Sequence, residues 1–401
     1  MKVMIIEPLG EGHHMHFVRL AVRKFLRAKF KLSLVTRRSA IMNPSYQLVK
    51  AETNGCIKTY FLPELKKNSN SSSLSILLKQ FKEWFVLKYK FSKIIKINKP
   101  DIIYIPDLDW VAKAIEILGS PFQKIPFVAL YMSPKFHRKL MGLGAPSRYD
   151  WLFDKLFKRL LKIPTLQKLI VMDEFFYKFV KKNYKSLAAK IVLAPDFAHF
   201  KMLPSKKISR ISLGISKNSK VILVYGYLDL KKGIPELLLS LFNTNVPNDL
   251  VILLAGQPST EIIQFMKSNA IKKLLLSRKI ITCFKFHDLS DERRVFAAAD
   301  AVWLGYTQGF LGSSGVMYQA IHSNLSIIGQ NKGIIGSYIK KYKLGIAVSP
   351  SNPKKVIKGI RDLFDNLDVY SKNNKFRKIL KKYHCPDMHY KVILSSLNKY
   401  V

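Results

Sequence analysis

The sequence predicts an α/β protein with two doubly wound parallel sheets, each in its own Rossmann-like domain. Short apolar runs that suit buried strands alternate with segments of helical periodicity along most of the chain. At 401 residues, the chain is longer than one compact core usually accommodates. The alternation stops over residues 196–219, where Pro204 and a polar run indicate a linker. We therefore expect domains at 1–195 and 220–385, the linker at 196–219, and a terminal helix at 386–401.

The first half opens with an apolar strand over residues 2–6 (KVMII), followed by a turn rich in Gly and His. The helix expected over 16–28 carries Phe17, Leu20 and Phe25 on one face. A polar run at 67–73 precedes a long amphipathic helix over 74–98, which Pro100 ends. The other strands of this half are expected at 32–36, 57–62, 102–105, 127–131, 168–172 and 191–193, and further helices at 149–161 and 174–182.

The second half repeats the alternation of strands and helices. Because each strand is followed by a helix, the strands of each half are expected to run parallel, with helices on both faces. Three helices are expected to complete the chain from Pro353 onward, at 353–366, 370–382 and 386–400. The strands are expected at 221–225, 250–255, 280–284 and 301–304, and the earlier helices at 235–242, 260–276 and 291–298.

The charge of the chain is strongly positive, with 68 Lys and Arg against 26 Asp and Glu and a formal net charge of +42. The excess is spread over both halves, so it is not a basic tail. Such a field favours anionic partners, namely nucleotides, anionic lipid or nucleic acid. No nucleic-acid-binding motif accompanies the charge, so we expect no nucleic-acid partner. A genome that favours Lys, Asn and Ile codons is the alternative explanation.

The remaining composition predicts a cytoplasmic globular protein. No run approaches the roughly 18 apolar residues of a membrane span, and the apolar run at the N-terminus is too short for a signal peptide. The three cysteines, Cys56, Cys283 and Cys385, are far apart, which favours neither disulfides nor a zinc site.

A loop rich in Gly and Ser, over residues 305–315, lies between the strand 301–304 and a helix with apolar residues at one face. A helix N-terminus that follows such a loop presents unpaired N–H groups at the positive end of the helix dipole, which suits a phosphate. An ordinary strand-to-helix turn is the alternative. The residues placed at this candidate phosphate site are Gly312, Ser313, Ser314, Gly315 and Val316.

A second loop, GYLDLKKG at 226–233, follows the strand 221–225. Gly226 allows a tight turn, and Lys232 lies where the next helix begins, so its ammonium group is a candidate ligand for a diphosphate. A solvated Lys-Lys turn is the alternative. Because ligands of open α/β sheets bind at the carboxyl ends of the strands, the two loops are expected to share one ligand.

Two groups of residues in the first half are candidates for contacts to a second substrate. Gly12, His13 and His14 follow the first strand. They lack a carboxylate at helical spacing, so no metal site is expected. In loops after two further strands, Asp107, Asp109 and His137 are candidates for acid–base catalysis or for contacts to sugar hydroxyls. For each of these residues, a turn or surface role is the alternative.

In its order of motifs, the chain resembles the GT-B glycosyltransferases, and more narrowly the large retaining family of group 1 that acts in bacterial polysaccharide and lipid-glycan assembly. The resemblance covers most of the chain and rests on the N-terminal strand with its Gly-His turn, RISLGISKNSKVILVYG, GYLDLKKG, VILLAG, FKFHDLSDERRVFAAAD, GSSGVMYQAIHSNLSIIG and GIIGSYI.

The resemblance implies two Rossmann-like domains that face each other across a cleft, with the last helix crossing back to the first domain. It implies a nucleotide-sugar donor, UDP-linked by expectation, on the second domain, with Lys232 and the 312–316 loop at the diphosphate and Gln319 at the ribose. Gly12 is assigned to the donor as well. The first domain would present a glycan or lipid-linked acceptor to His13, His14 and Asp109, with Asp107, His137 and Lys232 in catalytic roles. Neither a metal nor another cofactor is implied.

The chain departs from the family's E-x7-E motif, in which two glutamates contact the sugar and the ribose. Leu311 and Gln319 stand at these positions, and Tyr227 replaces the arginine that follows the first Gly of the phosphate loop. The amide of Gln319 still offers hydrogen bonds to ribose hydroxyls. The alternative is a catalytically degenerate relative that serves as a membrane-associated binding protein.

Two basic segments rich in aromatic residues, 81–98 and 136–162, predict peripheral association with an anionic membrane surface at the inner face of the cell membrane. Their aromatic residues include Trp84, Phe85, Trp151, Phe153 and Phe157. The alternative is a pair of helices whose apolar faces fill the core.

Overall fold

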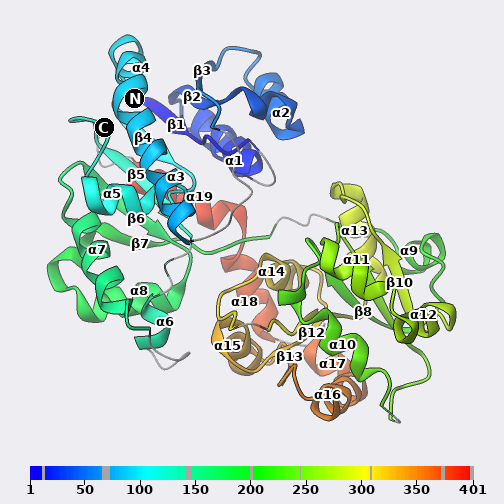
Figure 1. The fold of residues 1–401 in the computed structure, drawn as a ribbon. Helices are drawn as coiled ribbons and strands as arrows, with labels where there is room; N and C mark the ends of the chain where they lie inside the picture. Colours follow the sequence, from blue (N-terminus) through cyan, green and yellow to red (C-terminus); the bar gives the residue numbers. More distant parts are fainter. Residues whose placement is uncertain are drawn as a thin grey trace. The chain divides into compact units, whose positions relative to one another are not determined.

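The computed structural model describes residues 1–10, 14–65, 73–132, 134, 136–140, 147–198, 202–243, 245–307, 309–371 and 375–397. The chain divides into two compact units, and each contains one parallel sheet (Figure 1). The first unit comprises Met1–Pro195 and Pro386–Val401, and the second comprises Asp196–Cys385. The segment at 196–219, for which we expect a linker, contains the helix α9 (Lys206–Ser212) and belongs to the second unit.

The first unit has a seven-stranded parallel sheet in the order β3-β2-β1-β4-β5-β6-β7. The chain adds β2 and β3 on one side of β1 and continues with β4 on the other side. The point between β1 and β4, where the strand order reverses, is the usual ligand position in such sheets. The strands are β1 (Lys2–Ile6), β2 (Lys31–Arg37), β3 (Lys58–Leu62), β4 (Ile102–Ile105), β5 (Phe127–Tyr131), β6 (Leu166–Val171) and β7 (Ile191–Leu193).

Helices cover both faces of this sheet because its central strands are apolar on both sides. Met4 and Ile6 of β1 belong to the larger core cluster, whereas Val3 and Ile5, equally buried, point to the other face. The terminal helix packs on α1 through a hydrogen bond from the Tyr390 hydroxyl to Phe17 O. The helices are α1 (His14–Arg27), α2 (Pro44–Glu52), α3 (Ser73–Phe85), α4 (Phe91–Asn98), α5 (Ala112–Leu118), α6 (Phe136–Leu140), α7 (Asp150–Lys162), α8 (Glu174–Asn183) and α19 (Pro386–Leu397).

The second unit has a six-stranded parallel sheet in the order β10-β9-β8-β11-β12-β13, with its own reversal between β8 and β11. The strands are β8 (Lys220–Tyr225), β9 (Leu250–Ala255), β10 (Ile280–Cys283), β11 (Ala301–Leu304), β12 (Ser326–Gln330) and β13 (Gly345–Val348). Besides α9, the helices are α10 (Ile234–Ser240), α11 (Thr260–Met266), α12 (Asn269–Leu276), α13 (Leu289–Ala298), α14 (Gly315–His322), α15 (Gly333–Tyr342), α16 (Pro353–Asp365), α17 (Leu367–Tyr370) and α18 (Lys375–Tyr383).

The alternation of strands and helices predicted from the sequence is confirmed, although the helices α2, α5 and α15 were not predicted and three other details differ. The helix expected over 74–98 contains a π-helical turn at Val86–Lys90 between α3 and α4. The helix expected over 260–276 is divided, because Ser268 takes an extended backbone conformation before α12. The strands β12 and β13, which the sequence analysis did not predict, extend the second sheet beyond β11.

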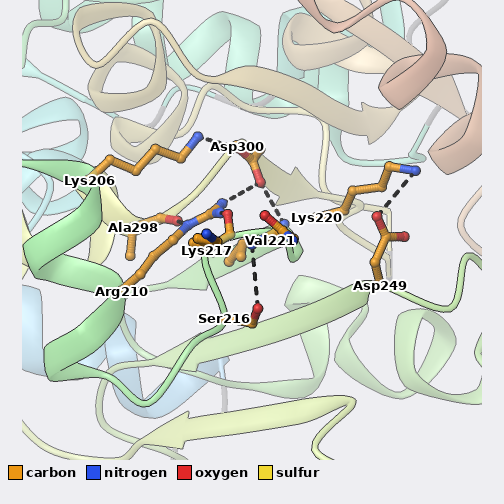
Figure 2. A network of polar contacts seen from close by, with 10 residues as sticks. Lys206, Arg210, Ser216, Lys217, Lys220, Val221, Asp249, Ala298 and Asp300 are labelled. Carbon is orange, nitrogen blue, oxygen red and sulfur yellow. Dashed lines mark hydrogen bonds and ion pairs between the residues drawn. The ribbon is translucent and has the colours of Figure 1, made fainter.

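A half-buried carboxylate, Asp300, connects α9 to the amino ends of β8 and β11 (Figure 2). One oxygen of Asp300 accepts hydrogen bonds from Val221 N at 2.7 Å and from Arg210 Nη2 at 2.8 Å, and the other accepts from Lys206 Nζ. Arg210 also donates to the main-chain oxygens of Ala298 and Lys217. This network fixes α9 at the edge of the sheet opposite to the carboxyl ends of its strands.

None of the helices in the described ranges has both the length and the apolar character that a membrane span requires. Within the same ranges, no group of three or more His, Cys, Asp and Glu side chains has the arrangement of a metal site.

Candidate functional site

Lys232 lies at the carboxyl end of the central strand of the second sheet. It ends a short 3-10 helix, Leu230–Lys232, and its Nζ donates to Tyr225 O, the last residue of β8, at 2.8 Å. Gly233 follows with a φ of +65°, and a Cβ there would come within 2.1 Å of Gly305 O. Only glycine therefore allows this loop to approach the loop after β11.

The loop after β11 contributes Tyr306, a residue that the sequence analysis did not select. Lys232 Nζ lies 3.4 Å from the Tyr306 hydroxyl and 5.4 Å from the centre of its ring. The Tyr306 hydroxyl lies 2.9 Å from Ser314 Oγ. Lys232 and Ser314, which the sequence analysis placed at one ligand, are thus connected through a single phenol.

The helix α14 begins at Gly315, as the sequence predicts, with Ser314 at the N-cap position. The Ser314 side chain makes no capping hydrogen bond to α14, since its hydroxyl contacts Tyr306 instead. Gly315 is exposed, and a Cβ built on it would meet no described atom within 4 Å. Gly312 is buried and Ser313 half-buried in the preceding loop, and Val316 is buried in the first turn. The N-terminus of α14 therefore has the open approach that an anion needs.

Gln319, one turn further along α14, does not point into the core. Its Nε2 donates a hydrogen bond to Glu292 Oε1 on α13, and Glu292 also forms a side-chain hydrogen bond with Tyr225. Burial raises the pKa of Glu292, and the bonds to Tyr225 and Gln319 act in the opposite direction. Tyr225 thus contacts Glu292 through its side chain and Lys232 through its main-chain oxygen.

In the first unit, a second polar group lies at the carboxyl ends of β1 and β4. His14 Nδ1 lies 3.5 Å from Asp107 Oδ2 and 3.7 Å from Glu7 Oε2. Burial and then the Glu7 charge raise the pKa of Asp107 to about 6. Burial alone would lower the pKa of His14, but the carboxylates of Glu7, Asp107 and Asp109 outweigh it and raise that pKa. The group thus contains a proton acceptor, Asp107, with a raised pKa, and it lies where the order of the sheet reverses.

Glu7 is the residue of this group that the sequence analysis missed. It is fully buried, burial raises its pKa, and its Oε1 accepts a hydrogen bond from Leu9 N at 2.9 Å. The signal was present, because Glu7 directly follows an apolar strand, and Asp107 likewise comes two residues after the strand 102–105. Tyr306 carries the same signal after β11, whereas nothing in the sequence connects Glu292 with Gln319.

The other candidates of the first unit have different surroundings. Asp109 accepts a hydrogen bond from Met132 N at 3.0 Å, which connects the loops after β4 and β5. His137 is fully buried against Phe176 and Phe179 with its Nε2 3.1 Å from Asp173 Oδ2, and burial lowers its pKa. These contacts suit packing of α6 on α8 more than catalysis. Gly12 and His13 lie outside the described residues.

A cavity of about 670 Å³ lies beside Asp300, lined by Lys206, Arg210 and Lys220 among others. It is at the amino ends of β8 and β11, whereas Lys232, Tyr306 and Glu292 gather at the carboxyl edge. The polar network at the carboxyl edge, and not this cavity, has the position that ligands of α/β sheets occupy.

Comparison with protein families gives one match in the second unit: residues 205–383 match the model described as glycosyl transferases group 1. No curated protein matches the sequence of this chain. The matched range contains Lys232, Tyr306, Ser314, Glu292 and Gln319.

Solved structures resemble the whole chain at low sequence identity. Sucrose-phosphate synthase from Thermosynechococcus elongatus matches with a TM-score of 0.70 and 14% identity, covering 100% of this chain and 98% of that one. Anabaena HepE in complex with UDP and glucose matches with a TM-score of 0.65 and 15% identity over both full chains. WaaG, a glycosyltransferase involved in lipopolysaccharide biosynthesis, matches with a TM-score of 0.62 and 12% identity over both full chains. At these identities the likeness shows the fold.

Proposed function

Since residues 205–383 match the model of the group 1 glycosyl transferases and the whole chain has the GT-B fold, we propose that it is a glycosyltransferase of this group, which transfers a sugar from a nucleotide sugar to a glycan or lipid-linked acceptor. The observation that carries the proposal is the network of Lys232, Tyr306 and Ser314 at the carboxyl edge of the second sheet. It joins a cation to the open N-terminus of a helix, which together suit a diphosphate.

The donor is proposed to be UDP-linked. HepE, which has the same fold, was solved with UDP and glucose, and this supports the same nucleotide here. Lys232 and the first turn of α14 would neutralise the diphosphate as it leaves, so the proposal needs no metal ion or other cofactor. Retention of the anomeric configuration is proposed on the resemblance to the retaining family alone.

The acceptor is proposed to bind the first unit. The His14–Asp107 pair offers a hydrogen-bond donor and an acceptor of raised pKa to a sugar hydroxyl, at the edge where that sheet reverses its order. A cell-envelope glycan or its lipid-linked precursor is the proposed acceptor class, in line with the involvement of WaaG in lipopolysaccharide biosynthesis.

We further propose that the protein works at the inner membrane surface. The exposed side chains of Phe85, Tyr89, Trp151 and Phe153 on the first unit, together with neighbouring lysines, support this. Two of the aromatic residues that the sequence analysis assigned to the membrane, Trp84 and Phe157, are instead buried in the core.

A nucleotide panel tests the donor site directly. UDP, GDP, ADP and CMP are added separately to the full chain, and the melting temperature is measured. A ligand that binds only the folded protein raises this temperature. We expect the largest rise with UDP, and a loss of that rise in Lys232→Ala. If none of the four nucleotides stabilises the protein, the proposed donor site is wrong.

A further inference from the structure

Glu292 lies between an amide and a phenol that come from different elements. Gln319 of α14 donates to its Oε1, and Tyr225 at the end of β8 bonds to the carboxyl group as well. A carboxylate has about four lone-pair positions, and these two contacts occupy two of them. Glu292 therefore has acceptor capacity for two more O–H or N–H donors.

Among the described residues, the charge of Glu292 has no cationic partner. In the part of the chain that the structure describes, the ion pairs near α13 join Asp291 to Lys285 and Arg294, and none involves Glu292. Glu292 is half-buried, so water compensates its charge only in part. Its neighbours are neutral hydrogen-bonding groups, which keeps the carboxylate available as an acceptor for neutral donors such as hydroxyls.

The position of Glu292 relative to the proposed diphosphate site suits a ribose. Its partner Gln319 lies four residues beyond Gly315 on α14, which corresponds to about 6 Å along the helix. Its other partner, Tyr225, is the residue whose carbonyl oxygen accepts from Lys232. The carboxylate is thus one helical turn from the groups assigned to phosphate, on the same edge of the sheet.

We propose that Glu292 binds the vicinal hydroxyls of the donor ribose and that Gln319 is a positioning residue that holds its carboxylate. The assignment rests on the proposed nucleotide-sugar function. It also accounts for the amide at position 319. A glutamate there would place two carboxylates in hydrogen-bond contact, and like charges at that distance disfavour each other's ionised form. The carboxylate that the family carries on α14 is, in this chain, supplied from α13.

The test compares a ribonucleotide with its 2′-deoxy form. UDP and 2′-deoxy-UDP are titrated calorimetrically into the full chain and into Glu292→Gln, Gln319→Glu and the double exchange Glu292→Gln/Gln319→Glu. Glu261→Gln, an exposed carboxylate on α11, is the matched control. If another diphosphate gives the largest thermal shift in the unchanged protein, that nucleotide and its 2′-deoxy form replace the pair.

We expect the unchanged protein and Glu261→Gln to bind UDP about 10-fold or more tightly than 2′-deoxy-UDP, as for a hydroxyl bonded to a charged acceptor. Glu292→Gln should weaken the binding of UDP about 10-fold and leave the affinity for 2′-deoxy-UDP nearly unchanged. The double exchange should recover part of the preference for UDP over 2′-deoxy-UDP, because positions 292 and 319 again carry one carboxylate and one amide. Gln319→Glu alone should weaken UDP and lower the melting temperature.

Two results would overturn the assignment. If Glu292→Gln keeps the affinity and the preference of the unchanged protein, another group binds the ribose and the donor site itself stands. If the unchanged protein binds no nucleoside diphosphate, the donor site fails and the assignment with it. Should Glu292→Gln not fold, the double exchange provides the comparison, because it leaves the number of charges the same. In that variant the carboxylate lies at position 319. If it still binds UDP over 2′-deoxy-UDP with the full preference of the unchanged protein, a specific role of Glu292 is contradicted.

Discussion

The ammonium group of Lys232 lies 5.4 Å from the centre of the Tyr306 ring, and its nitrogen is 3.4 Å from the Tyr306 hydroxyl. This relationship gives the lysine a fixed position. A third contact, to Tyr225 O, holds it at the end of β8, and its side chain is half-buried. The preceding Lys231 is exposed and has no such contacts among the described residues. Adjacent lysines in one loop thus differ in orientation.

Replacement of Lys232 should therefore affect chemistry more than stability. Removing a charge aimed at a departing diphosphate costs the transition state more than the ground state, so Lys232→Ala should lower turnover by about 10²-fold or more. The melting temperature should change little. Lys231→Ala is the control and should keep nearly full turnover. Equal and mild effects of both substitutions in steady-state assays would contradict the placement of the diphosphate.

Hydrophobic patterning is sufficient to predict most of the fold. Strands such as Val221–Tyr225 are continuous apolar runs because both of their faces are covered, and the helices between them carry one apolar face. The strands β12 and β13 were not predicted because each contains a glycine, Gly329 and Gly345, which shortens its apolar run. The π-helical turn at Val86–Lys90 changes neither composition nor amphipathicity, so the sequence carries no signal for it.

The candidate site was predicted only where its residues are near one another in sequence or follow a strand. Lys232 and Ser314 were found because each closes a Gly-rich loop after a strand. The contact of Gln319 with Glu292, 27 residues earlier, depends on how α13 packs beside α14. His137 was selected by residue type and loop position, and its burial against Phe176 could not be predicted from either.

The pH dependence of catalysis should reflect the ionisation of Asp107 and its buried neighbour Glu7. Burial and the charge of Glu7 raise the pKa of Asp107 to about 6, so its ionised form is lost as the pH falls below that value. If Asp107 accepts a proton or a hydroxyl bond from the acceptor, kcat/KM should fall on the acid side with an apparent pKa near 6. His14, Asp109, Tyr104 and Arg37 also face this pair and contribute to the apparent value.

The substitution Glu7→Gln distinguishes an influence of Glu7 on the pKa of Asp107 from the catalytic role of Asp107 itself. It removes a negative charge beside Asp107, so the acid limb should move to lower pH, with a smaller loss of kcat than in Asp107→Asn. Glu64→Gln, an exposed carboxylate of the same unit, is the control and should leave the profile unchanged. An acid limb that stays in place in Glu7→Gln would show that Glu7 does not influence the ionisation that matters for catalysis.

Two buried histidines should make stability depend on acid pH. His389 Nδ1 lies 2.8 Å from Pro195 O within the first unit, and His384 Nδ1 lies 2.7 Å from Asp196 O within the second. Burial lowers the pKa of each to about 4 from 6.5. The unfolded chain therefore binds protons that the folded chain does not. The free energy of unfolding should be constant above pH 6.5 with respect to these groups and fall as the pH drops toward 4.

The expected loss at pH 5 is about 2 kcal/mol for each histidine, from the difference in proton binding over 1.5 pH units. Melting temperatures and urea unfolding at pH 7 and pH 5, at one ionic strength, measure it. His389→Gln keeps a donor for Pro195 O and removes the titrating group, so its stability should change less between the two pH values. The same pH dependence in the variant and in the unchanged protein would assign the acid sensitivity to other groups.

Membrane association should depend on exposed aromatic residues of α7. Trp151 is 65% exposed, and Phe153, two residues further along α7, has the Lys113 ammonium group 4.9 Å from its ring centre. α5, which carries Lys113, packs against both α3 and α7, so α3, which ends at Phe85, lies on the same face of the sheet as α7 (Figure 1). Aromatic side chains among lysines favour the interface of an anionic bilayer, where the rings are buried and the ammonium groups meet lipid phosphates.

We expect the full chain to float with vesicles that contain phosphatidylglycerol and much less with pure phosphatidylcholine, and high salt should weaken the binding. The double substitution Trp151→Ser/Phe153→Ser should reduce the bound fraction by about tenfold in partition coefficient, since each ring loses apolar burial. Ile263→Ser/Leu276→Ser, which removes two exposed apolar side chains from the second unit, is the matched control and should bind as the unchanged protein does. Salt-independent flotation would remove the electrostatic part of the argument, and equal binding by both double variants would show that the contact surface lies elsewhere on the chain.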